Sequence, residues 1–226
     1  MHSTLLSTPV SAEVARALTR IGAVRTTTGQ PFVYTSGWAS PVYIDTRLLM
    51  SDVALRTRVM DLAAEAVAGL VARKGINAIV GAESSGIAFG AWLAERLGLP
   101  LLYLRKKPMG WGSAARLEGR LPEGARLLFI DDVTTDARSK IAAAAALRQD
   151  TTHVADVLVI VDYALYPDTH RHLVEHGLDL HALTNWHDLL AALRAAGLLD
   201  SAEDQTLTRF TADPVAWSVA NGGVGA

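Results

Sequence analysis

Two adjacent aspartates, followed by a cluster of hydroxyl side chains, are the part of the chain best suited to chemistry. The apolar run 127–130 is typical of a strand buried on both faces, and Asp131 and Asp132 follow it directly, before an alanine-rich helix expected over 139–148. Ligands of open parallel sheets bind where strands end, and the amides of a helix N-terminus suit phosphate. Carboxylates repel phosphate but can hold ribose hydroxyls or a water-clad Mg²⁺. The stretch therefore predicts a sugar-phosphate site, although polar residues that merely cap the helix remain an alternative.

Composition places the chain among globular proteins and excludes several kinds of site. Of its 226 residues, 50% are hydrophobic and 19% are charged, which fits one domain over 1–226. A net charge of -2 gives no reason to expect nucleic acid or a membrane surface as partner. The absence of cysteine excludes disulfides, thiol nucleophiles and cysteine metal sites. The N-terminal residues do not resemble a secretory signal, and no apolar run approaches the roughly 20 residues of a spanning helix. We expect a cytoplasmic protein.

The hydrophobic pattern changes near residue 76. Before it, helical spacing predicts helices over 11–21, with Ser11 and Glu13 as caps, and over 52–74, closed by Gly75. Two short β-type runs over 32–45 predict a hairpin. After it, strands and helices alternate, which predicts an α/β fold with a central parallel sheet flanked by helices. The expected strands are 76–80, 100–104, 126–132, 154–161 and 180–183, and the later helices are 87–97, 139–148, 170–176 and 186–196.

Three further segments carry polar groups next to expected strands. Residues 35–45 combine small residues with aromatics, and residues 81–86 form a tight loop between a strand and a helix. Residues 105–112 are basic and glycine-bearing and open a loop to residue 124, long enough to indicate a function. Each segment alone has an ordinary explanation: a hairpin with an aromatic plug, a common tight turn, and a solvated basic loop.

Taken together, these segments resemble a known family. Residues 131–139 resemble the phosphoribosyl-pyrophosphate (PRPP) motif of the type I phosphoribosyltransferases, and the other three are similar to the hood, pyrophosphate loop and mobile catalytic loop of the orotate phosphoribosyltransferases. The resemblance covers about 32–163. It implies the type I fold, with a hood over about 1–50, a core over about 51–165 and a C-terminal extension over about 166–226. It also implies a homodimer, because the mobile loop of relatives completes the neighbouring subunit's site.

The implied activity is that of a glycosyltransferase (pentosyltransferase). It is the Mg²⁺-dependent transfer of 5-phosphoribosyl from PRPP to orotate, which gives orotidine 5′-monophosphate and pyrophosphate in pyrimidine (UMP) biosynthesis. No residue is assigned as a metal ligand. The resemblance implies catalytic roles for Asp131, Asp132, Lys106 and Lys107. It implies PRPP contacts from Arg105, Lys106, Asp131, Asp132, Thr134, Thr135, Asp136, Ala137, Arg138, Ser139, Glu83, Ser84 and Ser85. It implies orotate contacts from Thr35, Ser36, Gly37, Tyr43, Ile44 and Thr135.

The chain departs from the family pattern at four positions. Aligned without gaps, Met109 stands where relatives usually carry the mobile-loop lysine, and losing one such donor costs about 10²–10³ in rate. Ala137 and Arg138 replace very small residues of the phosphate loop. Alanine there would be strained by about 1–2 kcal/mol if φ is positive, and Arg138 could either bind phosphate or fill the pocket. Tyr163 stands where many relatives have an arginine that contacts orotate.

These departures leave two alternatives to an active orotate enzyme. One is a catalytically impaired paralogue that binds a nucleotide or sugar phosphate or pairs with an active homologue. The other is a phosphoribosyltransferase for a different planar base, against which the hood argues.

Overall fold

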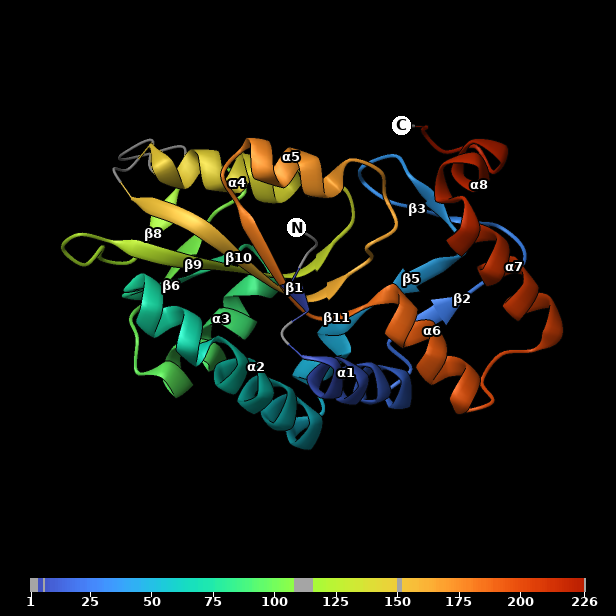
Figure 1. The fold of residues 1–226 in the computed structure, drawn as a ribbon, viewed down its shortest axis with the longest axis horizontal. Helices are drawn as coiled ribbons and strands as arrows, with labels where there is room; N and C mark the ends of the chain where they lie inside the picture. Colours follow the sequence, from blue (N-terminus) through green and yellow to red (C-terminus); the bar gives the residue numbers. More distant parts are fainter. Residues whose placement is uncertain (1–3, 6, 108–115, 150–151, 226) are drawn as a thin grey trace.

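A mostly parallel sheet forms the centre of the molecule (Figure 1). The computed structural model describes residues 4–5, 7–107, 116–149 and 152–225. Seven strands form the sheet, and every neighbouring pair is parallel except β7 and β8. The predicted α/β architecture is confirmed. In spatial order the strands are β1 (Thr4–Leu5), β11 (Asp179–Asn185), β10 (His153–Asp162), β9 (Arg126–Thr134), β6 (Ala78–Ala82), β7 (Leu101–Leu104) and β8 (Leu117–Glu118).

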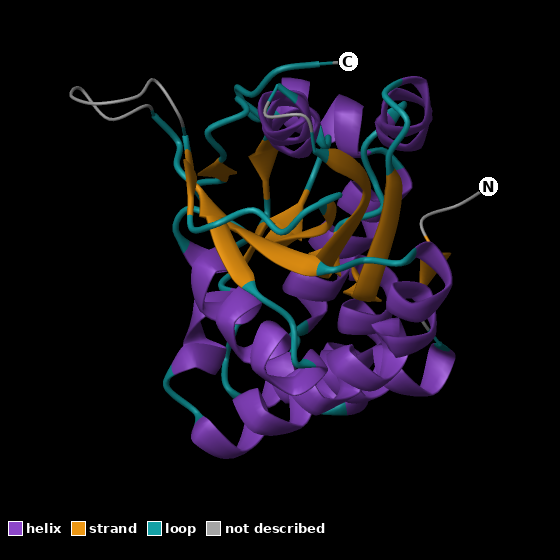
Figure 2. Cartoon of the chain, turned by 90° about the vertical axis from the view of Figure 1, so that its left-hand side faces the viewer, coloured by secondary structure: helices purple, strands orange, loops and turns teal. Residues whose placement is uncertain are grey.

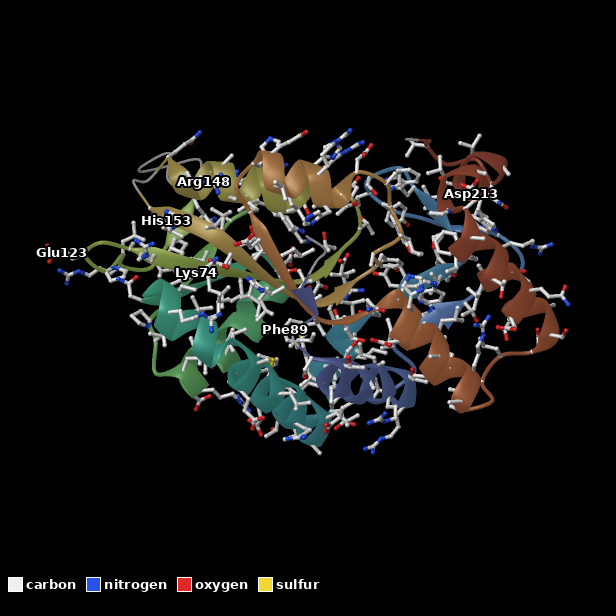
Figure 3. All side chains as sticks on the ribbon, in the orientation of Figure 1. Lys74, Phe89, Glu123, Arg148, His153 and Asp213 are labelled. Carbon is white, nitrogen blue, oxygen red and sulfur yellow. The ribbon has the colours of Figure 1, made fainter. Side chains whose placement is uncertain are left out.

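Helices cover both faces of the sheet, so its inner strands are apolar on both sides (Figures 1 and 2). Along β9, Leu128 and Ile130 pack on one face, while Leu127 and Phe129 pack on the other. The larger core includes Phe89 of α3, which is fully buried and labelled in Figure 3. One face carries α1 (Thr8–Arg20), α2 (Val53–Lys74), α3 (Ser85–Leu97) and α6 (Trp186–Ala195); the other carries α4 (Arg138–Arg148) and α5 (Thr169–Glu175).

The N-terminal region forms a hood of short antiparallel strands beside the sheet. A hairpin joins β3 (Phe32–Val33) to β4 (Ala39–Ser40) within the predicted range 32–45. The second predicted run, β5 (Val42–Ile44), does not pair with the first but with β2 (Val24–Thr26). The 3₁₀ helix η1 (Thr46–Met50) then leads into α2. Two helices that the sequence analysis missed, α7 (Ser201–Ala212) and α8 (Pro214–Ala220), lie next to the hood at the right of Figure 1.

Local signals explain where the helices begin and end. The Asp52 carboxylate accepts a hydrogen bond from the Leu55 amide at 2.9 Å, and Gly75 closes α2 with φ 63°, as predicted. The caps predicted for the first helix are wrong. Its cap is Ser7, and the helix begins earlier than predicted because Pro9 is tolerated in a first turn. Ser11 therefore lies inside the helix, where it is buried and bonds to Thr184 and Asp188.

Strand boundaries differ from expectation by up to two residues. Strand β6 runs from Ala78 to Ala82 rather than over 76–80, and β9 continues through the acid pair to Thr134. Strand β8 lies within the loop expected over 105–124. Over the part of the chain that the structure describes, no helix combines the length and hydrophobicity needed to cross a bilayer.

Candidate active site

A cleft of about 470 Å³ lies at the carboxyl ends of β6, β7 and β9. Parallel sheets bind ligands at this edge, and residues far apart in the sequence meet here. An adjoining hollow of about 430 Å³ adds Lys107. The predicted site residues that line the cleft are Thr35, Glu83, Ser84, Ser85, Arg105, Lys106, Asp131, Asp132 and Ser139.

The acid pair is held by its own backbone and by the hood. Asp131 Oδ1 accepts a hydrogen bond from the Asp132 amide, and Asp132 Oδ1 accepts one from the Val133 amide, each at 2.9 Å. Asp132 Oδ2 accepts from the Thr46 hydroxyl at 3.2 Å. Burial and then the neighbouring charge of Asp131 raise the pKa of Asp132, against the opposing effect of Lys140. The two carboxylates are therefore fixed acceptors at the edge of the cleft.

The loop after β9 turns sharply into the N-terminus of α4. Ala137 precedes the helix with φ 60°, a left-handed conformation that alanine adopts only under strain. Asp136 Oδ1 accepts from the Arg138 amide at 3.2 Å, and Thr134 is buried with its hydroxyl unpaired among the described residues. The Arg138 side chain is 67% exposed, with its Nε 3.5 Å from Asp136. Arg138 therefore does not fill the pocket.

The loop between β6 and α3 leads into a helix whose first turn approaches β9 closely. A Cβ on Gly86 would lie 2.5 Å from the carbonyl oxygen of Ile130, so no other residue fits there without a shift of the backbone. The Glu83–Ser84 peptide bond is cis. The Glu83 carboxylate accepts from the Lys106 amide at 2.7 Å and thereby joins this loop to the one after β7.

Four cationic side chains also line the cleft. Arg105 and Lys106 are joined there by two arginines that sequence reasoning missed, Arg47 and Arg116. Arg116 Nε donates to the Arg105 carbonyl at 2.8 Å, and Arg47 donates to Asp45 at 2.6 Å and to the Tyr43 hydroxyl at 3.0 Å. Arg116 stands close to the basic loop in sequence, which could have pointed to it; no local signal marks Arg47.

A third missed cation, Lys140, lies next to the acid pair. It is buried in the first turn of α4, and its ammonium donates to Asp131 Oδ2 at 2.6 Å. The predicted helix contained this lysine, but the sequence did not show that its side chain turns back towards β9.

Of the residues predicted to contact orotate, Thr35 lines the cleft and the others are not among its lining residues. Tyr43 packs against Phe32 with ring centroids 5.7 Å apart, and Ile44 is buried in the core. Tyr163 is also buried, and its hydroxyl pairs with that of Tyr34 at 2.8 Å. Burial raises the pKa of Tyr163, so this phenol stays neutral. Met109, which aligns with the mobile-loop lysine of relatives, lies outside the described residues.

Parallel sheet, hood and acid pair together define a type I phosphoribosyltransferase. No family model matches the chain. It is 39% identical over 208 residues to the orotate phosphoribosyltransferase of Jannaschia sp., covering 92% of this chain and 91% of the relative. The Ruegeria sp. enzyme of the same name is 41% identical over 207 residues, 92% of each chain. The crystal structure of orotate phosphoribosyltransferase from Aeropyrum pernix matches with a TM-score of 0.67 at 30% identity, covering 81% of this chain and 99% of that one. The chain belongs to the orotate phosphoribosyltransferase family.

Proposed function

We propose that this chain transfers the 5-phosphoribosyl group of PRPP to orotate, releasing pyrophosphate and forming orotidine 5′-monophosphate for UMP biosynthesis. The observation that carries the proposal is that Asp131 and Asp132 line one cleft together with cationic loops. The chain is also about 40% identical to two relatives named orotate phosphoribosyltransferase. The names of the relatives favour turnover and lend no support to an impaired paralogue.

The acid pair is suited to hold the ribose. Breaking the bond from ribose carbon to pyrophosphate passes through an oxocarbenium-like state, so the site needs positioned acceptors and no side-chain nucleophile. Asp131 and Asp132 would orient the ribose hydroxyls and steady the forming cation. Their fixed geometry supports this role, because groups that need no rearrangement contribute most to a transition state.

Phosphate groups would bind on both sides of the acid pair. Thr134, Thr135 and Ser139 would hold the 5′-phosphate with the main chain of Asp136, Ala137 and Arg138, at the N-terminus of α4. The pyrophosphate would meet Arg105, Lys106 and Lys107 together with the loop Glu83, Ser84 and Ser85. Arg116 adds a charge on this side. A concentration of donors around the leaving group is what the reaction requires.

Orotate would lie under the hood. Thr35 in the cleft, the Ser36 and Gly37 segment, and Tyr43 would supply polar contacts and an aromatic face, and Thr135 would approach from the phosphate loop. Because the Ile44 side chain is buried, its contribution would be through the main chain.

Magnesium would enter the cleft with its substrate. Among the residues that the structure describes, no group of three or more His, Asp or Glu side chains could hold a metal by itself. Mg²⁺ is commonly held through substrate phosphates with one or two carboxylates, so a complex of Mg²⁺ and PRPP fits this donor set. Bound there, the ion would add positive charge to the leaving pyrophosphate.

The proposal includes a cytoplasmic homodimer. Family resemblance supports the dimer, because the loop beginning at Arg105 reaches a neighbouring site in relatives. Sedimentation of the purified chain tests the assembly: a monomer at the concentrations of the assay, with full activity, would contradict it.

Turnover is the direct test of function. Purified protein should consume orotate in the presence of PRPP and Mg²⁺, and Asp131→Asn should abolish this. Asp179→Asn is a matched control, because Asp179 is an exposed carboxylate at the opposite end of the same sheet. Calorimetry that shows PRPP binding without product would instead favour the impaired paralogue, and a screen of other planar bases would reveal a different acceptor.

A further inference from the structure

Lys140 is a buried cation at an unfavourable place in its helix. It is 4% exposed, although a charge in the first turn of α4 opposes the helix dipole. Its ammonium donates to Asp131 Oδ2 and to the Val133 carbonyl, each at 2.6 Å, and to Ser139 Oγ at 3.3 Å. Three acceptors use all three of its donors, so the ammonium is held in one position. Stabilising the helix does not explain this lysine.

The Lys140 ammonium holds Asp131, one of the two residues of the acid pair. Asp131 accepts from Lys140 through one carboxylate oxygen and from the Asp132 amide through the other, and its side chain is still 17% exposed. The charged groups that face the pair are Arg47, from η1, and Lys140, from α4. Lys140 is the buried one, and a buried charge acts more strongly than one in water.

We propose that Lys140 is a positioning residue: its ammonium fixes the Asp131 carboxylate and offsets the like charge of Asp132, so that both acids can accept ribose hydroxyls together. This inference rests on the proposed function, because that function brings a phosphorylated ribose to the cleft. Two adjacent carboxylates repel each other, and without a cation one of them tends to take up a proton. A protonated or reoriented carboxyl would accept ribose hydroxyls less well.

The experiment compares Lys140→Met with variants that separate positioning from stability. Steady-state kinetics with PRPP, orotate and Mg²⁺ would be recorded over a pH range for the wild type and Lys140→Met. Because Asp131→Asn is expected to lack turnover, calorimetry would measure PRPP affinity for these two proteins, Asp131→Asn and the double variant. Lys74→Met is the control: Lys74, labelled in Figure 3, pairs with Asp156 at 2.7 Å at the other end of the sheet. Lys140→Gln serves as a second variant, because an amide keeps a hydrogen-bond donor without the charge.

We expect Lys140→Met to lower kcat/KM for PRPP by about 10- to 100-fold, as the loss of a group that orients a binding residue commonly does. The acid limb of its pH profile should move to higher pH, because the acid pair has lost its buried counter-charge. Lys140→Gln should lie between Lys140→Met and the wild type. Adding Lys140→Met to Asp131→Asn should lower the affinity for PRPP little further, because the lysine acts through that aspartate. Lys74→Met should lose thermal stability and keep the wild-type profile.

Three results would overturn the inference. They are a Lys140→Met enzyme with kcat/KM within twofold of wild type at every pH, equal losses of PRPP affinity with and without Asp131→Asn, and tighter PRPP binding after removal of the lysine. The last would mean that Lys140 blocks Asp131 instead of presenting it. If Lys140→Met fails to fold, two other variants decide the question. Lys140→Gln keeps a hydrogen-bond donor near Asp131, and the double variant has no carboxylate left unpaired at position 131. A wild type without turnover would instead refute the proposed function.

Discussion

The Trp38 indole Nε1 donates to Asp136 Oδ2 across 3.4 Å, which joins the hood to the loop that opens α4. Trp38 is 2% exposed, and its ring centroid lies 4.8 Å from that of Tyr166. The C-terminal tail holds the same hood segment, because the Ala39 amide donates to Ser218 Oγ at 3.0 Å and the Val224 amide donates to the Gly37 carbonyl at 3.0 Å. The proposed base and phosphate sites are therefore attached to each other directly.

Removing the indole donor should weaken substrate binding at both sites. In Trp38→Phe the ring remains but the hydrogen bond to Asp136 is lost, at a cost of about 1 kcal/mol, or about fivefold. We expect KM for orotate and for PRPP to rise by about this factor, with a smaller change in kcat. Trp92→Phe is the control, because Trp92 packs against Arg56 on the helical face of the core. Equal kinetic effects in the two variants would contradict the link.

The strained turn before α4 gives a prediction about stability. Ala137 has φ 60°, which costs alanine about 1–2 kcal/mol, whereas glycine adopts it freely. Ala137→Gly should therefore raise Tm by about 2–4 °C. The greater conformational entropy of the unfolded glycine variant reduces this gain. Ala145→Gly, at an exposed position of the same helix, should lower Tm instead, because glycine there costs about 1 kcal/mol. Thermal unfolding of the two variants checks the opposite signs; a fall in both would show that Ala137 is unstrained.

Structural features that depend only on neighbouring residues could be predicted from the sequence. The end of α2 at Gly75 and the buried strand before the acid pair follow from local periodicity and capping, which need no knowledge of the rest of the fold. The same kind of signal was available for α7, where Asp200 and Glu203 form a capping box, and it was missed.

Features that depend on the assembled fold could not be predicted in this way. Strand β2 pairs with β5 across the hood, and β1 adds to β11 from the other end of the chain, so neither partner is visible locally. The directions of Lys140 and Arg47 depend on how α4 and η1 dock against β9. The sequence placed the acid pair at a cleft, but it did not reveal which cations surround that pair.

The acid pair should itself lower stability at neutral pH. Because burial and Asp131 raise the pKa of Asp132 above its unfolded value, the folded protein binds more protons than the unfolded chain between these two pKa values. Stability therefore falls as pH rises through this window, and at neutral pH the ionised carboxylate is unfavourable. Asp132→Asn should raise Tm at pH 7 and abolish turnover, with the gain in Tm shrinking towards acid pH. Asp61→Asn, which removes an exposed partner of Arg96, should change Tm little. A lower Tm for Asp132→Asn would refute the assignment.

At the other end of the sheet, a buried aspartate should have the opposite pH dependence. Asp156 is 3% exposed and accepts from Lys74 Nζ at 2.7 Å and from His181 Nε2 at 2.8 Å. Burial pushes the pKa of Asp156 up, but these hydrogen bonds outweigh burial and hold it below its usual value. Its stabilising contribution is thus present above the unfolded pKa of about 3.9 and is lost as pH falls through the folded pKa.

Asp156→Asn should therefore lower Tm at pH 7 and differ less from the wild type in acid. Leaving Lys74 and His181 with a poorer partner should cost about 2 kcal/mol, or about 4–8 °C in Tm. Asp179→Asn tests the same lysine through a carboxylate whose side chain is 65% exposed, and exposed pairs contribute about 0–1 kcal/mol, so its loss should be smaller at every pH. Thermal unfolding between pH 7 and about pH 3 provides the comparison. If the Tm difference for Asp156→Asn stayed constant across that range, the carboxylate would stabilise the fold through packing and not through its charge.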